Sequence, residues 1–337
     1  MSEPQEHSVN IEDNDLTCWG CGLRVLLPSS APIFKCGWCG AITNKNVHKH
    51  GTQGVRWRDM RDRFFVGMLL GFMIFFICGG VWAVHPIVFS ISYLCGTFHC
   101  VVTAILAMCT ISTFSLAAFK CAGSPPEIAW GSFQLVGKGG LENYTFCPYC
   151  EKPKSTRAHH CRSCRICILD MDHHCPFIGN CVGASNHRYF ISFLISTVLS
   201  TIYVSIMTAY AGLQIWPPIA IRSLGTLDGA GSPLALLTLK ELMFGVLQSA
   251  THLSLRGVIL FYLFMASFSV TIGLVVLLCQ QLSYIYKGKT YLGLLNSESS
   301  SEVEERDCKN LLRFFGCPYM ASKYLPNFWN SRKIHDK

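Results

Sequence analysis

Charged residues are scarce in this sequence, and the shortage limits what the protein can be. Of its 337 residues only 14% are Asp, Glu, Lys or Arg, while 50% are hydrophobic and the mean hydropathy is +0.34. An ordinary soluble domain has roughly a quarter of its residues charged. Because the missing charge is concentrated in a few apolar runs, the composition argues against a purely soluble protein and favours a multi-span membrane protein.

An apolar run near the N-terminus is also lacking. Residues 2–15 are polar and acidic, so we expect no cleaved signal peptide, and the first spanning segment would serve as the signal. Residues 1–17 are predicted to be disordered, and the acidic, serine-rich run at 296–305 is predicted to be a flexible surface segment.

Four apolar stretches are long enough to cross a bilayer as helices, which requires about 20 residues. We predict spans at 64–84, 97–119, 189–213 and 257–282. His85-Pro86 is predicted to close the first span, and residues 87–96 to form a short connection. Within the loop at 214–256, the spacing of apolar residues over 234–255 predicts an amphipathic or re-entrant helix.

Positive charge lies almost entirely on one side of these four spans. Of the 28 Lys and Arg residues, 25 precede the first span, separate spans two and three, or follow span four, and 3 lie in the loop at 214–256. Positive residues mark the cytoplasmic side, so both termini should be cytoplasmic and that loop lumenal. The predicted fold is an α-helical integral membrane protein with four transmembrane helices and a cytosolic, zinc-bound, cysteine-rich domain between spans two and three. Its parts are an N-terminal region 1–55, helices one and two at 64–119, the cysteine-rich domain at 120–188, helices three and four at 189–282, and a tail at 283–337.

The cysteines favour metal binding over disulfides. There are nineteen, and the polar ones form C-x-x-C pairs mixed with histidine, a pattern typical of zinc ligation in a reducing cytosol. Two such pairs near the N-terminus predict one zinc ribbon over 18–39, with ligands Cys18, Cys21, Cys36 and Cys39. The segment 18–39 resembles the small plant-type zinc fingers of cell-death regulators. We interpret the ribbon as a structural or protein-binding finger without chemistry of its own.

A denser cluster separates the second and third spans. Seven cysteines and four histidines fall between residues 147 and 181, whereas two closed zinc sites would use eight of these side chains. The pairs Cys147/Cys150 and Cys161/Cys164 each start a site, but spacing alone does not assign the later ligands. A cysteine left outside the zinc sites is a candidate nucleophile, because neighbouring imidazole and carboxylate groups can activate it. The run 172–175, Asp-His-His-Cys, contains all three groups.

The pattern C-x2-C-x9-H-C-x2-C-x2-C-x4-D-H-H-C-x5-C-x4-N-x3-F runs from Cys147 to Phe190 without a gap. It resembles the cysteine-rich domain of the DHHC protein S-acyltransferases, or palmitoyltransferases, and the four predicted spans extend the resemblance. The resemblance implies Cys175 as the acyl-accepting nucleophile, His173 as its base and Asp172 as the residue that polarises His173; His159 is left for a structural hydrogen bond. It implies two zinc ions, one held by Cys147, Cys150, His160 and Cys167 and the other by Cys161, Cys164, His174 and Cys181.

The resemblance further implies transfer of a fatty acyl group from an acyl-CoA, such as palmitoyl-CoA, to cysteines of membrane-associated proteins. The expected location is an endomembrane, with the Golgi favoured, or the plasma membrane. This sequence differs from the family pattern at two motifs. Other residues stand at 122–126 in place of Asp-Pro-Gly, and Thr290 is the one residue of Thr-Thr-x-Glu that is present. The asparagine of the family's tail motif is matched by Asn310. A non-enzymatic membrane scaffold is the alternative function, against which the intact run 172–175 argues. A nucleic-acid binder, suggested by the net charge of +8, is excluded by the four spans.

Overall fold

The computed structural model describes residues 15–26, 33–44, 55–125, 141, 144–155, 157–217, 234–297 and 308–316. The predicted flexible run at 296–305 lies almost wholly outside these residues. The described parts of 1–66, 117–188 and 284–337 form one compact unit, which we term the cysteine-rich unit. Those of 67–116 and 189–283 form a second, the transmembrane unit.

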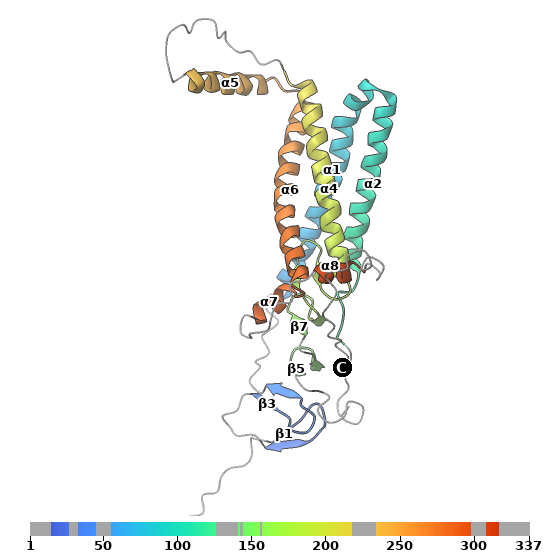
Figure 1. Cartoon of the computed structure of the whole chain (residues 1–337), viewed down its shortest axis with the longest axis vertical. Helices are drawn as coiled ribbons and strands as arrows, with labels where there is room; N and C mark the ends of the chain where they lie inside the picture. Colours follow the sequence, from blue (N-terminus) through green and yellow to red (C-terminus); the bar gives the residue numbers. More distant parts are fainter. Residues whose placement is uncertain are drawn as a thin grey trace, which may run out of the picture. The chain divides into compact units, whose positions relative to one another are not determined.

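The prediction of four spanning helices is confirmed. Among the described residues, four helices are long and apolar enough to cross a bilayer, and they run side by side in Figure 1. A lipid environment offers no partners for backbone N–H and C=O groups, so an apolar run of this length becomes helical. The bounds of the four helices are Val55–Ile91 (α1), Tyr93–Phe119 (α2), His187–Ile215 (α4) and Leu255–Tyr286 (α6).

The predicted end of the first span is wrong. Helix α1 continues through Pro86 to Ile91 and α2 begins at Tyr93, so a single residue, Ser92, replaces the predicted connection at 87–96. A proline removes one backbone hydrogen bond of its helix. Membrane helices tolerate this loss because neighbouring helices and side chains can bond the freed backbone group. The buried residues Val84 and Val88 lie on either side of Pro86 and pack in one cluster with Met207 of α4 and Leu260 of α6, which explains why the helix is retained.

Hydroxyl side chains link the helices of the transmembrane unit. Thr110 and Thr113 of α2 lie 2.9 Å from Ser200 and Ser196 of α4, respectively. Small polar residues allow close helix approach and hydrogen-bond across the interface. A further helix, α5 (Leu234–Ala250), falls within the region predicted to be amphipathic, and Trp216 donates a hydrogen bond to Ser249 near its end.

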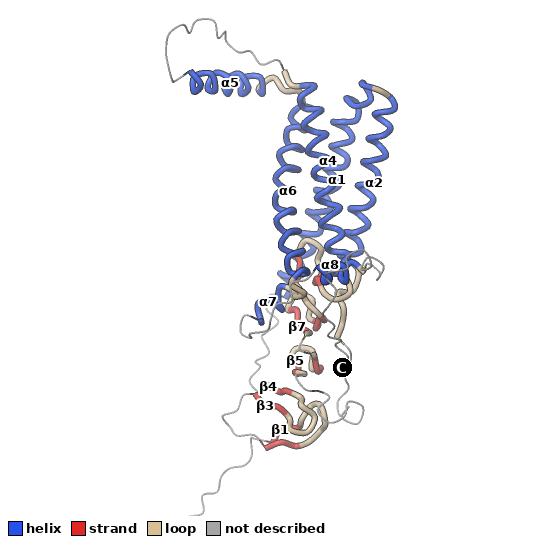
Figure 2. The backbone as a smooth tube through the Cα atoms, in the orientation of Figure 1, coloured by secondary structure: helices blue, strands red, loops and turns tan. Residues whose placement is uncertain are grey.

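Short strands and turns make up the described residues within 15–44 and 144–182, as Figure 2 shows. They form three two-stranded sheets and one of four strands in the order β3-β4-β5-β6. The strands are Asp15–Thr17 (β1), Arg24–Leu26 (β2), Ile33–Lys35 (β3), Ile42–Asn44 (β4), Thr145–Cys147 (β5), Lys152–Lys154 (β6), Ala158–Cys161 (β7), Ile166–Leu169 (β8), His173–Cys175 (β9) and Asn180–Val182 (β10). Because β1 pairs with β2, the predicted disorder over 1–17 is wrong for residues 15–17.

The C-x-x-C knuckles share one backbone device. The residue after the second cysteine has a positive φ in all four: 74° at Gly22, 80° at Gly40, 52° at Glu151 and 60° at Arg165. A residue in the left-handed backbone conformation reverses the direction of the chain, so that the two thiols of the knuckle can face the same point. Glycine adopts this conformation without steric cost, and the N-terminal knuckles use it at both positions.

The described part of the tail contains two short helices. Thr290 directly precedes helix α7 (Tyr291–Ser297), and its Oγ1 accepts a hydrogen bond from the Gly293 N–H at 3.1 Å and so caps the helix. Helix α8 (Cys308–Phe315) is tied to the end of α6, because the Asn310 side chain donates to the Tyr286 carbonyl at 3.0 Å.

Candidate active site and metal centres

In the part of the chain that the structure describes, three groups of cysteine and histidine side chains each converge on one point. The ligand atoms of each group lie within 4.8 Å of one another. Zinc takes sulfur at about 2.3 Å and imidazole nitrogen at about 2.0–2.1 Å, so a tetrahedral site separates two sulfurs by about 3.8 Å and sulfur from nitrogen by about 3.5 Å. The donor sets and spacings of all three groups are therefore those that zinc requires.

The first group consists of Cys147, Cys150, His160 and Cys167. The Nδ1 atom of His160 lies 3.6 Å from the sulfur of Cys147 and 3.3 Å from that of Cys150. Contact with Cys167 lowers the pKa of Cys147 to about 5, and the same contact raises the pKa of Cys167. Negative charge thus gathers where a cation would bind.

The second group consists of Cys161, Cys164, His174 and Cys181. The Nδ1 atom of His174 lies 3.6, 3.4 and 3.5 Å from the three sulfurs, in chain order. These two groups are the same sets that the family resemblance implies. His159 lies outside both, half-buried on β7, where burial lowers its pKa.

Asp62 of α1 supports the second group from outside its ligand shell. Its Oδ2 accepts a hydrogen bond from Nε2 of His174 at 2.8 Å, while Oδ1 pairs with Arg61. A carboxylate on the far nitrogen fixes the ring and leaves Nδ1 free for a metal. Asp62 is only 8% exposed. The sequence analysis assigned no role to this aspartate, because no motif marks it.

Cys175 belongs to neither group and lies beside a polarised histidine. Nδ1 of His173 is 2.8 Å from Oδ2 of Asp172, and His173 also hydrogen-bonds Cys175. Burial lowers the pKa of His173, but the bonds to Asp172 and Cys175 outweigh this and raise it to about 9. A protonated imidazole beside a thiol stabilises the thiolate. Carboxylate, imidazole and thiol are therefore arranged for nucleophilic chemistry.

Asp172 is held by the tail as well as by His173. It is fully buried, and its Oδ1 accepts the Tyr291 backbone N–H at 2.6 Å. Burial alone would raise the pKa of Asp172, but the hydrogen bonds from His173 and Tyr291 lower it. The capping by Thr290 orients this N–H at the start of α7. Thr290, the one residue of the Thr-Thr-x-Glu motif present here, therefore supports the site through the backbone N–H of Tyr291.

Backbone hydrogen bonds hold the segment in which other residues stand in place of the Asp-Pro-Gly motif. The carbonyl groups of Ala122 and Gly123 accept hydrogen bonds from the N–H groups of Ser185 and Leu169, both at 3.0 Å. Asn180, beside the second group, donates to the Lys120 carbonyl at 2.8 Å just past the end of α2. The chain after α2 is thus fixed to the cysteine-rich segment without the motif's side chains.

The hairpin that carries Cys175 contacts the start of the first apolar run. Its two strands, β9 and β10, pair with Cys175 opposite Asn180. In the turn between them, the ring of Phe177 lies 5.0 Å from the ring of Phe65 of α1. Phe65 is the second residue of the predicted first span. The candidate nucleophile therefore lies two residues before Phe177, whose ring contacts Phe65 near the start of the predicted first span.

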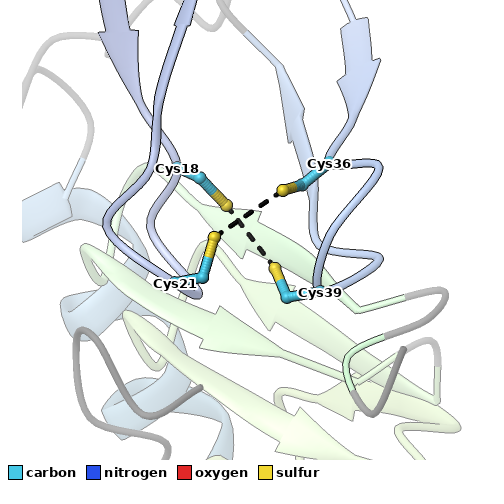
Figure 3. A group of neighbouring side chains, drawn as sticks. All are labelled: Cys18, Cys21, Cys36 and Cys39. Atoms are coloured by element: carbon cyan, nitrogen blue, oxygen red, sulfur yellow. Dashed lines mark hydrogen bonds between the residues drawn. The ribbon is translucent and has the colours of Figure 1, made fainter. Parts of the chain in front are cut away.

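The third group lies in the N-terminal ribbon. Figure 3 shows Cys18, Cys21, Cys36 and Cys39 pointing toward one another from two knuckles. The sulfurs of Cys18 and Cys39 are 3.6 Å apart, and those of Cys21 and Cys36 are 3.7 Å apart. All four donors are sulfur, as in structural zinc sites, and no position is left open for a reacting ligand.

Comparison with known proteins connects the central segment to one enzyme family. Residues 141–298 match the family model of DHHC palmitoyltransferase. Palmitoyltransferase PFA3 of Kluyveromyces lactis is 41% identical over 92 residues, 27% of this chain and 27% of that protein. Palmitoyltransferase ZDHHC16A of Danio rerio is 35% identical over 136 residues, 40% of this chain and 27% of that protein. Palmitoyltransferase ZDHHC15 of Homo sapiens is 41% identical over 84 residues, 25% of this chain and 24% of that protein. The match thus spans about a quarter of each relative.

Proposed function

We propose that this chain, which carries a DHHC palmitoyltransferase domain over residues 141–298, is a membrane-embedded protein S-acyltransferase. The observation that carries the proposal is the hydrogen-bonded set Asp172, His173 and Cys175, which lies inside the matched segment but outside both metal-ligand groups. A scaffold that only recruits partners has no use for a polarised histidine beside a spare thiol.

In the first step the Cys175 sulfur attacks the carbonyl carbon of a fatty acyl-CoA thioester. The new S–C bond forms as the bond to the CoA sulfur breaks, and His173 passes the proton of Cys175 to the departing thiolate. Asp172 keeps Nδ1 of His173 occupied, so that Nε2 faces the thiol. The two zinc ions would hold the surrounding knuckles through their eight ligands and supply rigidity rather than chemistry.

In the second step a cysteine of a protein substrate attacks the acyl-Cys175 thioester. His173 takes the proton of the incoming thiol, and Cys175 leaves as a thiolate beside the imidazolium. Two thioesters of similar energy are exchanged, so the enzyme contributes orientation and a reactive thiolate. The membrane retains the acyl chain, because each buried CH₂ contributes about 0.8 kcal/mol.

The Phe177–Phe65 contact and the charge distribution support a cytosolic site at the membrane surface. Arg58, Arg61 and Arg63 precede the first apolar run, as expected of a cytoplasmic boundary. We therefore place both termini in the cytoplasm, with palmitoyl-CoA or a similar acyl-CoA as donor and membrane-associated proteins as acceptors. An endomembrane such as the Golgi, or the plasma membrane, would supply both.

Acyl loading of the purified full-length protein tests the proposal. We expect a hydroxylamine-labile label from palmitoyl-CoA in the wild-type protein and none in Cys175→Ser. Cys164→Ser is not a suitable control because it removes a candidate metal ligand, whereas Cys279→Ser changes an exposed cysteine of α6 and should label normally. Equal labelling of Cys175→Ser and wild type would refute the nucleophile assignment. Metal analysis of the same samples should give three zinc ions per chain.

A further inference from the structure

The N-terminal ribbon is not a separate finger, because its strands join the sheet of the first catalytic knuckle. Strand β4 pairs in parallel with β5, with Ile42 opposite Thr145. The Ile42 N–H donates to the Tyr144 carbonyl at 2.8 Å, and the Leu141 N–H donates to the Cys39 carbonyl at 3.1 Å. Strand β5 ends at Cys147, a ligand of the first candidate zinc site.

Side chains from the two segments also share one core. Trp19 and Leu141 are 2% and 1% exposed and belong to a single buried cluster with the ribbon cysteines. The Trp19 ring lies 6.2 Å from that of Phe146, and its indole N–H donates to the Ile42 carbonyl at 3.2 Å. A Cβ atom on Gly20 would lie 2.7 Å from Leu141, so the fit leaves no room at this point.

We propose that the four-cysteine ribbon is a positioning element of the acyltransferase domain. A metal ion on Cys18, Cys21, Cys36 and Cys39 fixes the two knuckles, whose strand and tryptophan hold β5 and therefore Cys147 in place. The ribbon touches none of the reacting atoms and acts through the first zinc site. Its role in catalysis rests on the proposed function, whereas the coupling of the two metal sites does not.

The coupling predicts an effect in both directions, since linkage between two sites is reciprocal. The double variant Cys36→Ser/Cys39→Ser removes the ribbon metal, and Leu141→Ala truncates the fully buried side chain that the catalytic segment contributes to the shared core while leaving every ligand intact. Partners outside a ligand shell change metal affinity by roughly 10- to 100-fold. We expect a change at the lower end of this range in each case.

The test uses the full-length protein in lipid nanodiscs, with zinc release followed by a chromogenic chelator. In Cys36→Ser/Cys39→Ser, one of the two remaining zinc ions should leave about tenfold faster. Hydrogen exchange should accelerate at residues 144–147 and stay unchanged at β9 and β10, which distinguishes lost positioning from general unfolding. In Leu141→Ala, zinc should leave the ribbon faster. Trp38→Ala is the matched control, because Trp38 lies in the same knuckle and is 45% exposed; it should behave as wild type.

The proposal would be overturned if the double variant shows the wild-type rate of hydrogen exchange at 144–147 and the wild-type rate of zinc release from the catalytic sites. The ribbon would then be an independent finger. The same holds if Leu141→Ala leaves release from the ribbon unchanged. Neither measurement needs acyl transfer. A wild-type protein that takes up no acyl group would therefore refute the proposed function, while these two measurements would still decide whether the ribbon positions β5.

Discussion

Removing the carboxylate of Asp62 should loosen one zinc site without touching a ligand. In Asp62→Ala, Nε2 of His174 loses its partner at 2.8 Å, in a position where the two side chains are only 13% and 12% exposed. Loss of such an outer-shell carboxylate lowers metal affinity roughly 10- to 100-fold, equivalent to about 1.4–2.7 kcal/mol. The cost of an unpaired buried polar group, about 1–3 kcal/mol, agrees with this range.

The assay is release of zinc to a chelator from the full-length protein in nanodiscs. We expect one of three zinc ions to leave 10- to 100-fold faster in Asp62→Ala. Asp59→Ala is the matched control: Asp59 lies one turn earlier on α1 and pairs with Arg165 at 2.7 Å, but both side chains are about half exposed. An exposed ion pair contributes about 0.2–1 kcal/mol, so this variant should release zinc nearly as wild type. Wild-type release in Asp62→Ala would refute the second-site support that we assign to Asp62.

Three further substitutions test the catalytic set and its supports. Asp172→Ala removes the partner of His173 Nδ1 and should slow acyl loading of Cys175 by about 100-fold or more; loading at the wild-type rate would exclude a role for this carboxylate. Thr290→Val removes the cap of α7 and, at about 1 kcal/mol, should slow loading about fivefold, whereas Thr290→Ser should restore it. Asn310→Ala removes the hydrogen bond to the Tyr286 carbonyl and should lower the free energy of unfolding by about 1 kcal/mol. Thermal denaturation measures this change, and Leu312→Ala serves as a comparison for simple loss of side-chain volume in α8.

The spans illustrate where sequence reasoning holds and where it stops. Four apolar runs predicted four helices, because in lipid a run of this length has no alternative backbone structure. The same reasoning ended the first helix at Pro86, where a soluble helix would break. Packing of Val84 and Val88 against α4 and α6 keeps the helix intact to Ile91, and no local signal reports that packing.

The candidate site shows a similar division. Spacing indicated that two zinc sites start at Cys147/Cys150 and Cys161/Cys164 but left the later ligands open, and only the family resemblance proposed a division. The structure gathers the same two sets. The missing Asp-Pro-Gly motif suggested a weakened attachment of this segment. Ala122 and Gly123 nevertheless bind the cysteine-rich segment through their backbone carbonyl groups, which are present whatever the side chain.

The sequence was enough to predict the membrane class, the number of spans and the metal-binding segments, and it contains the run Asp172 to Cys175. These features depend on run length and on spacing between neighbours in the chain. Tertiary structure alone decided that Asp62 supports His174, that the Tyr291 N–H holds Asp172, and that β4 pairs with β5. Each of these contacts joins residues about a hundred positions apart. Such a contact arises from the way the whole chain closes on itself, and a single sequence carries no local pattern for it.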